Sequence, residues 1–401
     1  MRHDPVTEPP EGPLAIAMVS LHANPLAAGS ATAQEVSQHV AHLAAGLVGL
    51  GHDVVVYTRR SDPDSPAEQL SGTGFRVVNL DAGPARPLSP EDSHPYVGEF
   101  TDRMRAHWTH SPPDVVHAHF WLSGLAAVLA ARETGVRVVQ TFHEFARGSA
   151  PGAAQRAKVE RMVALAVDHV ITPTSSRLAH VVRMGVPRPS ITVVPSGVDT
   201  TTFRPDGPRA ERGLPHRLVV PGEPVARSGF ATALRAASTL PETEVVMIGA
   251  GLHSQDGTAL RALVHDLGLT GRVHLTGPGT PEERAALLRS ADVVVCPQQH
   301  DGFCIPAIEA MSCGVPVVAA PVGGLADTVV DQVTGVHLSQ HTPRELAMVL
   351  RPLLGNPGMR EQLGVAGRDR AVHRYDSARV AAEAELVYRG DHATADIALP
   401  K

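Results

Sequence analysis

The fold of this chain can be read outward from the stretch His300-Asp-Gly-Phe-Cys-Ile-Pro-Ala-Ile-Glu-Ala-Met-Ser-Cys-Gly-Val-Pro-Val-Val318. The pattern predicts a loop and then a short helix from Pro306 to Cys313, because proline suits a first helical turn. Gly314 ends that helix, and the apolar run after it is typical of a buried strand. Two carboxylates, Asp301 and Glu309, therefore flank a helix N-terminus. Free backbone N–H groups favour anions there, and acidic groups beside them can bind sugar hydroxyls.

Short apolar runs alternate with helical patterns on both sides of this stretch. In the first half the expected strands are Leu14 to Ser20, Asp53 to Thr58, Phe75 to Leu80, Asp114 to His119, Val136 to Thr141, His169 to Pro173 and Ile191 to Pro195. In the second half they are Arg217 to Pro221, Glu244 to Gly249, Arg272 to Thr276, Asp292 to Pro297 and Val315 to Ala319. Buried strands that alternate with helices predict parallel sheets, here in two doubly wound Rossmann-like α/β domains.

The chain has 401 residues, more than one hydrophobic core usually organises, so two domains are expected. A segment rich in Gly, Pro, Asp and Arg separates the two halves and is interpreted as a hinge. The expected divisions are a disordered leader at 1–13, a first domain at 14–198, the hinge at 199–216, a second domain at 217–375, a crossing helix at 376–390 and a loose tail at 391–401.

Composition excludes several classes of protein. The net charge of −6 gives no basic surface for nucleic acid. The three cysteines, Cys296, Cys304 and Cys313, have no metal-ligand spacing, and free thiols suit a reducing cytoplasm. No apolar run approaches the roughly 18 residues of a membrane span, and residues 1–13 contain no apolar core of a signal peptide. We therefore expect a cytoplasmic protein with no integral membrane segment.

The segment that starts at Asp301 resembles the signature of retaining glycosyltransferases of family four. Their pattern is Glu, seven residues, Glu, and then Ala-Met-Ala-Cys-Gly-x-Pro-Val; here Asp301 and Glu309 precede Ala310-Met-Ser-Cys-Gly-Val-Pro-Val317. Similarity to actinobacterial members, among them enzymes of the mycothiol pathway and of aminoglycoside assembly, extends from Leu14 to Tyr388. Further familial segments are Ser20–Ala27, Gly51–Arg60, Asp114–Gly124, Gln140–His143 and Val194–Asp199. The resemblance implies a GT-B fold, with two Rossmann-like domains that face a cleft and a C-terminal helix that returns to the first domain.

The resemblance also assigns roles on the donor side. Glu309 would bind the nucleotide ribose diol, since an ionised carboxylate can accept from two hydroxyls. Asp301 would contact donor-sugar hydroxyls with an arm one methylene shorter than the usual Glu, and His143 would touch the donor sugar near its reacting carbon. The N–H groups of residues 302–305 would line the sugar and phosphate, namely those of Gly302, Phe303, Cys304 and Ile305.

The chain departs from the family pattern where the donor diphosphate is expected. Relatives carry Arg and Lys after the strand that opens the second domain, but here Glu223 and Ser228 stand at these positions. A carboxylate would repel the diphosphate, whereas the fork of Arg227 would suit it. Three interpretations stay open: Arg227 has taken over the role, the alignment is shifted by one residue, or the chain is a non-catalytic relative. In the first domain, Gly29 is the glycine that remains in a loop expected to approach the donor.

On the acceptor side, the resemblance places Phe120 and Glu144 where relatives bind an acceptor phosphate. Phenylalanine cannot donate a hydrogen bond and glutamate repels phosphate, so Glu144 together with Glu35 favours a cationic acceptor such as an aminocyclitol or amino sugar. A solvated loop carboxylate is the competing interpretation of Glu144. His119 and Arg156 complete the expected acceptor site.

The expected activity is retaining transfer of a hexosyl or aminohexosyl group from a nucleotide-diphosphate sugar, commonly UDP-linked, to a hydroxyl of a small amine-bearing acceptor. No metal and no cofactor beyond the nucleotide sugar are expected, and whether the chain forms a homodimer is left open. Two alternatives remain at this stage: a non-catalytic GT-B relative that binds a nucleotide sugar or a partner protein, and a GT-B epimerase or phosphorylase.

Overall fold

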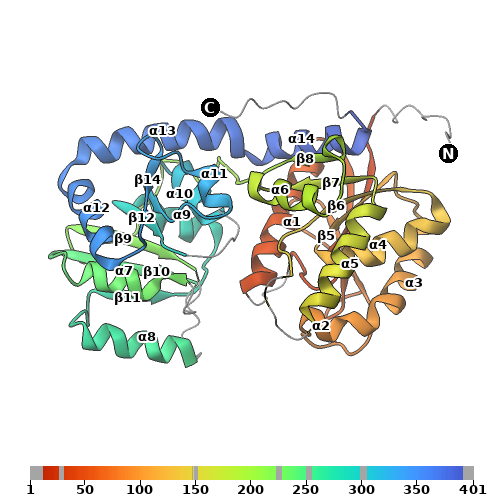
Figure 1. The fold of residues 1–401 in the computed structure, drawn as a ribbon, viewed down its shortest axis with the longest axis horizontal. Coiled ribbons are helices and arrows are strands. Elements are labelled where there is room, and N and C mark those ends of the chain that lie inside the picture. Colours follow the sequence, from red (N-terminus) through yellow and green to blue (C-terminus); the bar gives the residue numbers. More distant parts are fainter. Residues whose placement is uncertain are drawn as a thin grey trace. The chain divides into compact units, whose positions relative to one another are not determined.

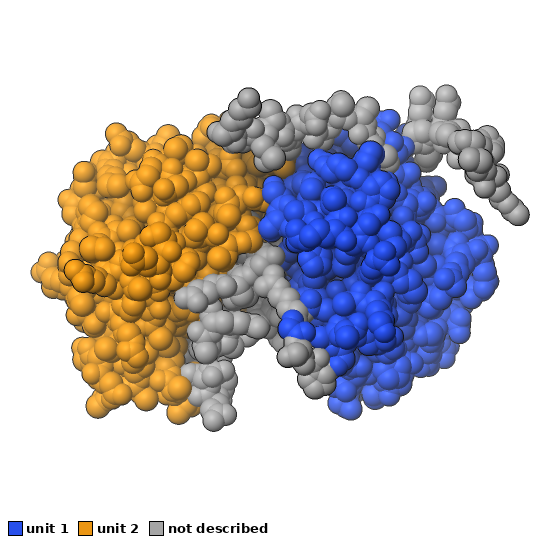
Figure 2. Space-filling model, in the orientation of Figure 1, with its two compact units in different colours: residues 1–195, 377–401 blue, residues 196–376 orange. Residues whose placement is uncertain are grey.

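The computed structural model describes residues 12–26, 31–146, 148, 152–222, 228–249, 255–298 and 305–391. The chain divides into two compact units, residues 1–195 with 377–401 and residues 196–376 (Figure 2). Each unit is an α/β layer structure built on a mainly parallel sheet, as the alternation of strands and helices predicted (Figure 1). Within the described residues, no helix combines the length and the apolar content needed to cross a bilayer.

The first unit contains an eight-stranded sheet in the order β3-β4-β2-β1-β5-β6-β7-β8. All neighbours pair in parallel except β3, which runs antiparallel to β4 at the edge. The strands are β1 (Ala15–Val19), β2 (Asp53–Arg59), β3 (Glu68–Leu70), β4 (Arg76–Leu80), β5 (Val115–His119), β6 (Arg137–Thr141), β7 (His169–Thr172) and β8 (Ile191–Val193). The seven strands predicted for this half are all present, whereas the exposed three-residue β3 was not predicted.

Both faces of this sheet are buried, which explains its nearly continuous apolar strands. Along β1, Ala17 and Val19 belong to one hydrophobic core, while Ile16 and Met18 belong to a second. Because successive strand side chains point to opposite faces, the two cores lie on opposite sides of the sheet. Helices cover them: α1 (Ala31–Gly49), α2 (Pro90–Ser93), α3 (Val97–Trp108), α4 (Trp121–Thr134), α5 (Ala153–Ala166), α6 (Ser175–Arg183) and α14 (Ser377–Arg389), with 3-10 turns η1 (His94–Tyr96) and η2 (Arg188–Ser190).

The last helix, α14, belongs to the first unit although it follows the second unit in the sequence. It packs on α1, and Gly46 permits the close approach, since a Cβ there would lie 2.7 Å from the Ser377 carbonyl oxygen. The buried Tyr388 hydroxyl lies 2.7 Å from Nδ1 of His117 on β5. The expectation of a final helix that returns to the first domain is therefore confirmed.

The second unit contains a six-stranded parallel sheet in the order β11-β10-β9-β12-β13-β14. Its strands are β9 (His216–Pro221), β10 (Thr243–Ile248), β11 (Val273–Thr276), β12 (Val293–Cys296), β13 (Val317–Ala319) and β14 (Gly335–His337). The described helices are α7 (Phe230–Ala237), α8 (Gln255–Asp266), α9 (Pro281–Arg289), α10 (Ile305–Ser312), α11 (Gly324–Thr328), α12 (Pro343–Gly355) and α13 (Pro357–Tyr375). In both units the strand order reverses beside the first strand of the sheet, as in a doubly wound fold.

Helix α10 and strand β13 form the helix and the strand predicted from residues 300–318, whereas the loop before them lies outside the described residues. Gly314 adopts a left-handed φ of 73° just after the helix. Its N–H donates to the Met311 carbonyl, and the N–H of Val315 donates to the Ala310 carbonyl. This pair of hydrogen bonds is a Schellman motif, which satisfies carbonyls at the helix end and requires the glycine.

The segment 199–216, expected to be a hinge, is grouped with the second unit. Its Phe203 is 1 % exposed and belongs to the core of that unit, and Arg368 on α13 donates to the Phe203 carbonyl. The segment is therefore packed rather than a free linker. Of the expected leader and tail, only residues 12, 13 and 391 lie within the described residues.

Candidate functional site

In the first unit, the strand order reverses between β1 and β5, and ligands of doubly wound folds bind beyond the carboxyl ends of the strands at such a point. Three polar side chains follow strand ends in this region. His22 comes after β1, His119 is the last residue of β5, and His143 comes two residues after β6. The fold thus gathers residues that lie far apart in the sequence.

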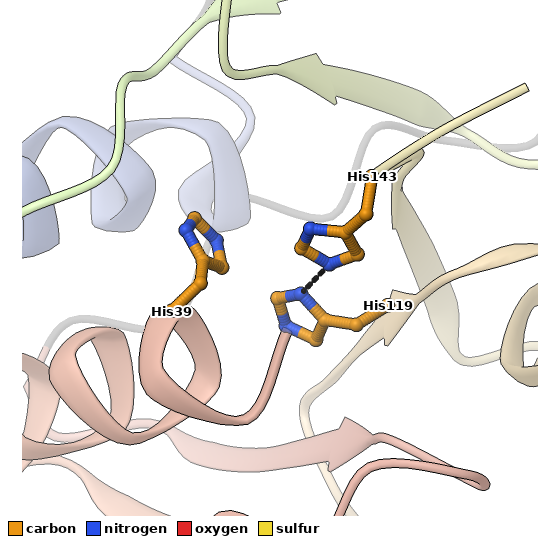
Figure 3. Close-up of side chains that lie close together, drawn as sticks. All are labelled: His39, His119 and His143. Carbon is orange, nitrogen blue, oxygen red and sulfur yellow. Dashed lines mark hydrogen bonds between the residues drawn. The ribbon is translucent and has the colours of Figure 1, made fainter. Parts of the chain in front are cut away.

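A cluster of three histidines is formed by His39 on α1, His119 and His143 (Figure 3). Nδ1 of His119 lies 3.2 Å from Nε2 of His143, and one of these nitrogens donates a hydrogen bond to the other. The ring of His39 approaches both, with centroid distances of 5.5 Å to His119 and 5.1 Å to His143. All three side chains are buried.

Burial lowers the pKa of each ring, because a charged imidazolium is poorly solvated there. For His39 the pKa falls to about 3, with further lowering by His42 and Arg177. For His119 and His143 the pKa lies well below the usual value for the same main reason. The cluster is therefore a group of neutral imidazoles at neutral pH. Neutral imidazoles can bind metal ions or exchange hydrogen bonds.

Phe120 lies between this cluster and a charged network. It has a φ of 76°, unusual for a residue with a side chain, and its N–H donates to the Thr141 carbonyl. Its buried ring lies 4.3 Å from the His22 ring by centroids, and the Arg156 guanidinium carbon lies 5.0 Å from the Phe120 ring centroid. Phe120 thus makes a cation–π contact with Arg156.

Arg156 is held by two carboxylates. Its Nε donates to Glu160 Oε1 at 2.7 Å, and its Nη2 donates to Glu144 Oε1 at 3.1 Å. Glu160 is buried, and burial raises its pKa against the lowering effect of hydrogen bonds from the Ala146 N–H and Arg156. The Glu144 side chain, in contrast, is 42 % exposed. The half-exposed carboxylate of Glu144 therefore lies beside the guanidinium of Arg156, which is already paired with Glu160.

In the second unit the corresponding reversal lies between β9 and β12. Gly229, before α7, has a φ of 77°, and a Cβ there would lie 2.5 Å from the Pro297 carbonyl oxygen after β12. The neighbouring Ser228 is buried, and its Oγ accepts a hydrogen bond from the Phe230 N–H at 3.4 Å. This backbone approach places Ser228 near the ends of the two central strands.

Glu309 lies inside α10 and is 4 % exposed. Arg284 on α9 donates to it through Nη2 at 2.9 Å and through Nε at 3.4 Å. The guanidinium carbon of Arg284 also lies 5.6 Å from the ring centroid of Phe203. A carboxylate has several lone pairs, so Glu309 can accept hydrogen bonds from ligand hydroxyls besides those from Arg284.

The structure brings His119, His143 and Phe120 into one neighbourhood, with Glu144 and Arg156 adjoining Phe120. Glu35 lies near the start of α1, and Ile305 begins α10 with a buried side chain. The other predicted site residues lie outside the described residues: Gly29, Glu223, Arg227, Asp301, Gly302, Phe303 and Cys304. The roles assigned to all of these residues stay predictions.

Two residues of these clusters were not identified from the sequence. His39 stands on the buried stripe of α1 beside Val36 and Val40, and a polar residue in such a stripe was a usable signal. Arg284 follows a capping box formed by Thr280 and Glu283 and looks like an ordinary surface arginine of an amphipathic helix. Its contact with Glu309 depends on the packing of α9 against α10, which spacing does not show.

Both units match families of known proteins. Residues 35–197 match the model of the glycosyl transferase 4-like domain, and residues 215–370 match that of glycosyl transferases group 1. The D-inositol 3-phosphate glycosyltransferase of Acidothermus cellulolyticus is 34 % identical over 383 residues, covering 88 % of this chain and 85 % of that protein. The protein of the same name from Xylanimonas cellulosilytica is 35 % identical over 381 residues, covering 88 % and 91 %.

Solved structures give the same fold. A sucrose-phosphate synthase from Thermosynechococcus elongatus superposes with a TM-score of 0.82 at 25 % identity, covering 94 % of this chain and 99 % of that one. The Anabaena protein HepE, solved in complex with UDP and glucose, superposes with a TM-score of 0.73 at 16 % identity, covering 93 % and 99 %. At the latter identity the likeness supports the fold alone.

Proposed function

The chain belongs to the family-four glycosyltransferases of GT-B fold, and from this premise we propose that it moves a hexosyl or aminohexosyl group from a UDP-sugar to a hydroxyl of a small amine-bearing acceptor. In the proposed retaining reaction the bond from the anomeric carbon to the diphosphate oxygen breaks. A bond from that carbon to the acceptor oxygen forms on the same face. The acceptor proton passes to the leaving diphosphate, so no dedicated protein base is required.

Glu309 supports the donor part of this proposal. Its carboxylate is buried and is oriented by Arg284. A vicinal diol, such as that of a ribose, can donate two charge-assisted hydrogen bonds to one carboxylate. Because the Arg284 contact at 3.4 Å is long, part of the acceptor capacity of Glu309 is left for a ligand.

The acceptor part rests on one observation, the pairing of Arg156 with both Glu144 and Glu160. When Glu160 is ionised, the two carboxylates and the one guanidinium together carry a net negative charge. The carboxylate that reaches solvent is Glu144. An ammonium group beside Glu144 would gain a charge-assisted hydrogen bond, whereas a phosphate would meet repulsion from Glu144 and an arginine already engaged.

A phosphorylated cyclitol is the second candidate acceptor. The relatives described above are named D-inositol 3-phosphate glycosyltransferases, and Arg156 provides a guanidinium of the kind that binds phosphate. For this candidate Arg156 has to exchange at least one carboxylate for the phosphate. The exposed Glu144 is the partner that can be displaced, since Glu160 is buried and also accepts from the Ala146 N–H.

Product analysis by mass spectrometry distinguishes the two acceptors. The protein is incubated with UDP-glucose, UDP-galactose and UDP-N-acetylglucosamine against aminocyclitols, the matching neutral cyclitols and D-inositol 3-phosphate. We expect release of UDP and a sugar-sized mass gain on the amine-bearing acceptors. Transfer to inositol phosphate and not to amines would overturn the proposed acceptor in favour of the second candidate. The anomeric configuration of the product, read by NMR, tests retention.

A further inference from the structure

We propose that His39, His119 and His143 form a binding site for a divalent transition-metal ion, with zinc as the ion whose chemistry fits best. The three side chains come from α1, from the end of β5 and from the segment after β6, and their rings face a shared space (Figure 3). One ligand nitrogen from each ring lies within 4.8 Å of those from the other two. Histidine nitrogen is a preferred ligand of zinc.

The spacing of the rings matches a tetrahedral site. For Zn–N bonds of about 2.05 Å, three imidazoles on a tetrahedral ion have ring centroids about 5.2 Å apart and ligand nitrogens about 3.3 Å apart. The observed centroid distances are 5.5 Å, 5.1 Å and 5.3 Å. Nδ1 of His119 and Nε2 of His143 are 3.2 Å apart. The remaining nitrogen, that of His39, has to move inward by at most about 1.5 Å.

The protonation of the cluster suits a metal. Each ring is neutral, because burial lowers all three pKa values, and a neutral imidazole has a lone pair for the ion. Nδ1 of His119 and Nε2 of His143 share one hydrogen. When an ion replaces that hydrogen, the proton moves to a distal ring nitrogen, and both rings stay neutral. Binding through this pair therefore requires no net loss of protons.

One buried nitrogen of the cluster lacks a hydrogen-bond partner, whichever residue of the His119–His143 pair is the donor. Nε2 of His119 is buried and has no hydrogen-bond partner among the described residues. The hydrogen bond to His143 engages Nδ1 of His119. Nε2 is therefore an unpaired acceptor if Nδ1 is the donor, and an unpaired donor if Nδ1 is the acceptor. Buried polar atoms without partners are unusual in structural histidines.

The surrounding charge determines the fourth ligand. Burial is the main cause of the lowered pKa of His39 and of His143, and the positive charge of Arg177 contributes to it. His42 acts on His39, and His22 and His117 act on His143 in the same direction. The three-histidine group contains no carboxylate. A divalent ion on three neutral ligands near a guanidinium therefore favours an anion, such as hydroxide or azide, in its fourth position.

An occupied site has a consequence for transfer that rests on the proposed function. The family resemblance gives His143 a contact with the donor sugar, so a bound ion would remove that contact and inhibit the reaction. Metal binding itself is measured without donor or acceptor. Failure of the metal site and failure of the proposed transfer are therefore separate results.

Titration of the full, chelator-treated chain with Co²⁺ tests the site. We expect one Co²⁺ per chain with the intense visible bands of a four-coordinate ion, displacement by Zn²⁺, and a shift of the bands on addition of azide. The variant His39→Gln should lose the intense bands and weaken binding at least about tenfold. His110→Gln, at an exposed histidine of the same unit, is the matched control and should bind as the original protein does.

Two results would overturn the proposal: only the weak bands of a six-coordinate ion in the original protein, or unchanged Co²⁺ binding by a folded His39→Gln variant. If circular dichroism shows that this variant does not fold, X-ray absorption of the zinc-loaded original protein decides the matter. Three imidazole nitrogens at about 2.0 Å support the site, and a shell of mainly oxygen ligands contradicts it.

Discussion

Arg284 on α9 donates to both carboxylate oxygens of the buried Glu309 on α10, at 2.9 Å and 3.4 Å. Removing one partner of such a pair leaves an uncompensated buried charge. For Arg284→Met we therefore expect the free energy of unfolding to fall by about 3–5 kcal/mol. The KM for the UDP-sugar should rise at least about tenfold, because Glu309 loses the partner that orients it, while the KM for the acceptor stays unchanged. Denaturant titration and initial-rate kinetics measure these quantities.

The double variant Arg284→Met with Glu309→Gln separates stability from donor binding. It should recover most of the lost stability, since no charge is left unpaired, but the raised donor KM should remain. Arg261→Met on the exposed face of α8 serves as the control. If Arg284→Met leaves the donor KM unchanged in a folded protein, Glu309 does not bind the donor through this geometry.

Glu144→Gln tests the acceptor. Replacing a half-exposed carboxylate by an amide removes the charge but keeps the size, so the KM for amine-bearing acceptors should rise about five- to twentyfold. The KM for a neutral cyclitol of the same shape should not change. Glu133→Gln is the control, because Glu133 likewise pairs an exposed carboxylate with an arginine in this unit. An equal KM for amines in Glu144→Gln and the original protein would rule out an ion pair between Glu144 and the acceptor.

Acid stability should reflect the buried histidines of the first unit. Burial lowers the pKa of His22 to about 4 and that of His39 and His117 to about 3. Below about pH 6.5 the unfolded chain binds protons that the folded chain does not, so stability falls as the pH falls. Each such histidine contributes a loss of about 1.4 kcal/mol per pH unit between its two pKa values.

Denaturant titrations from pH 7.5 to pH 5, with chelator present, measure this slope. His22→Gln should make it shallower by nearly one proton, whereas His265→Gln should leave it unchanged, because the His265 side chain is 84 % exposed. Equal slopes for His22→Gln and the original protein would show that His22 titrates normally in the folded state.

The contact between α1 and α14 gives a prediction about packing. A methyl group at position 46 would lie 2.7 Å from the Ser377 carbonyl oxygen and 2.8 Å from Cβ of Ala381, so Gly46→Ala should lower the free energy of unfolding by about 1–3 kcal/mol. Gly49→Ala on the same helix is the matched control, since its Cβ would meet nothing within 4 Å. That control should be neutral or slightly stabilising. Equal stability of the two variants would mean that α14 packs less closely than described.

The strands and the two-unit division could be predicted because buried parallel strands are continuous apolar runs bounded by turns. Strand β3 escaped prediction because all three of its residues are exposed, so it has no apolar signature. Strand β14, with Gly335 at its start, is equally short. Composition was also a poor guide to the packing of the segment expected to be a hinge. Its composition is that of a linker, but Phe203 anchors it in the core of the second unit.

The helix that carries Glu309 was predictable from a local motif, while the role assigned to Glu309 stays a prediction. The His39 cluster and the Arg284 contact were not predictable, because each joins segments brought together only by tertiary packing. His39 and His119 are 80 positions apart, and Arg284 and Glu309 are 25 positions apart. Contacts between residues so far apart in the sequence can be identified only once the order of the strands in the sheet is known.

The position of α14 has a consequence for biosynthesis. Residues 196–376 lie within the sequence of the first unit, so the ribosome makes the whole second unit before it makes the helix that covers α1. Until then, the face of α1 at Gly46, which packs against Ser377 and Ala381, lacks the partner that it has in the finished molecule. While 181 further residues are synthesised, the nascent first unit therefore exposes the surface of α1 that α14 later covers. A chaperone can bind such a surface during this time.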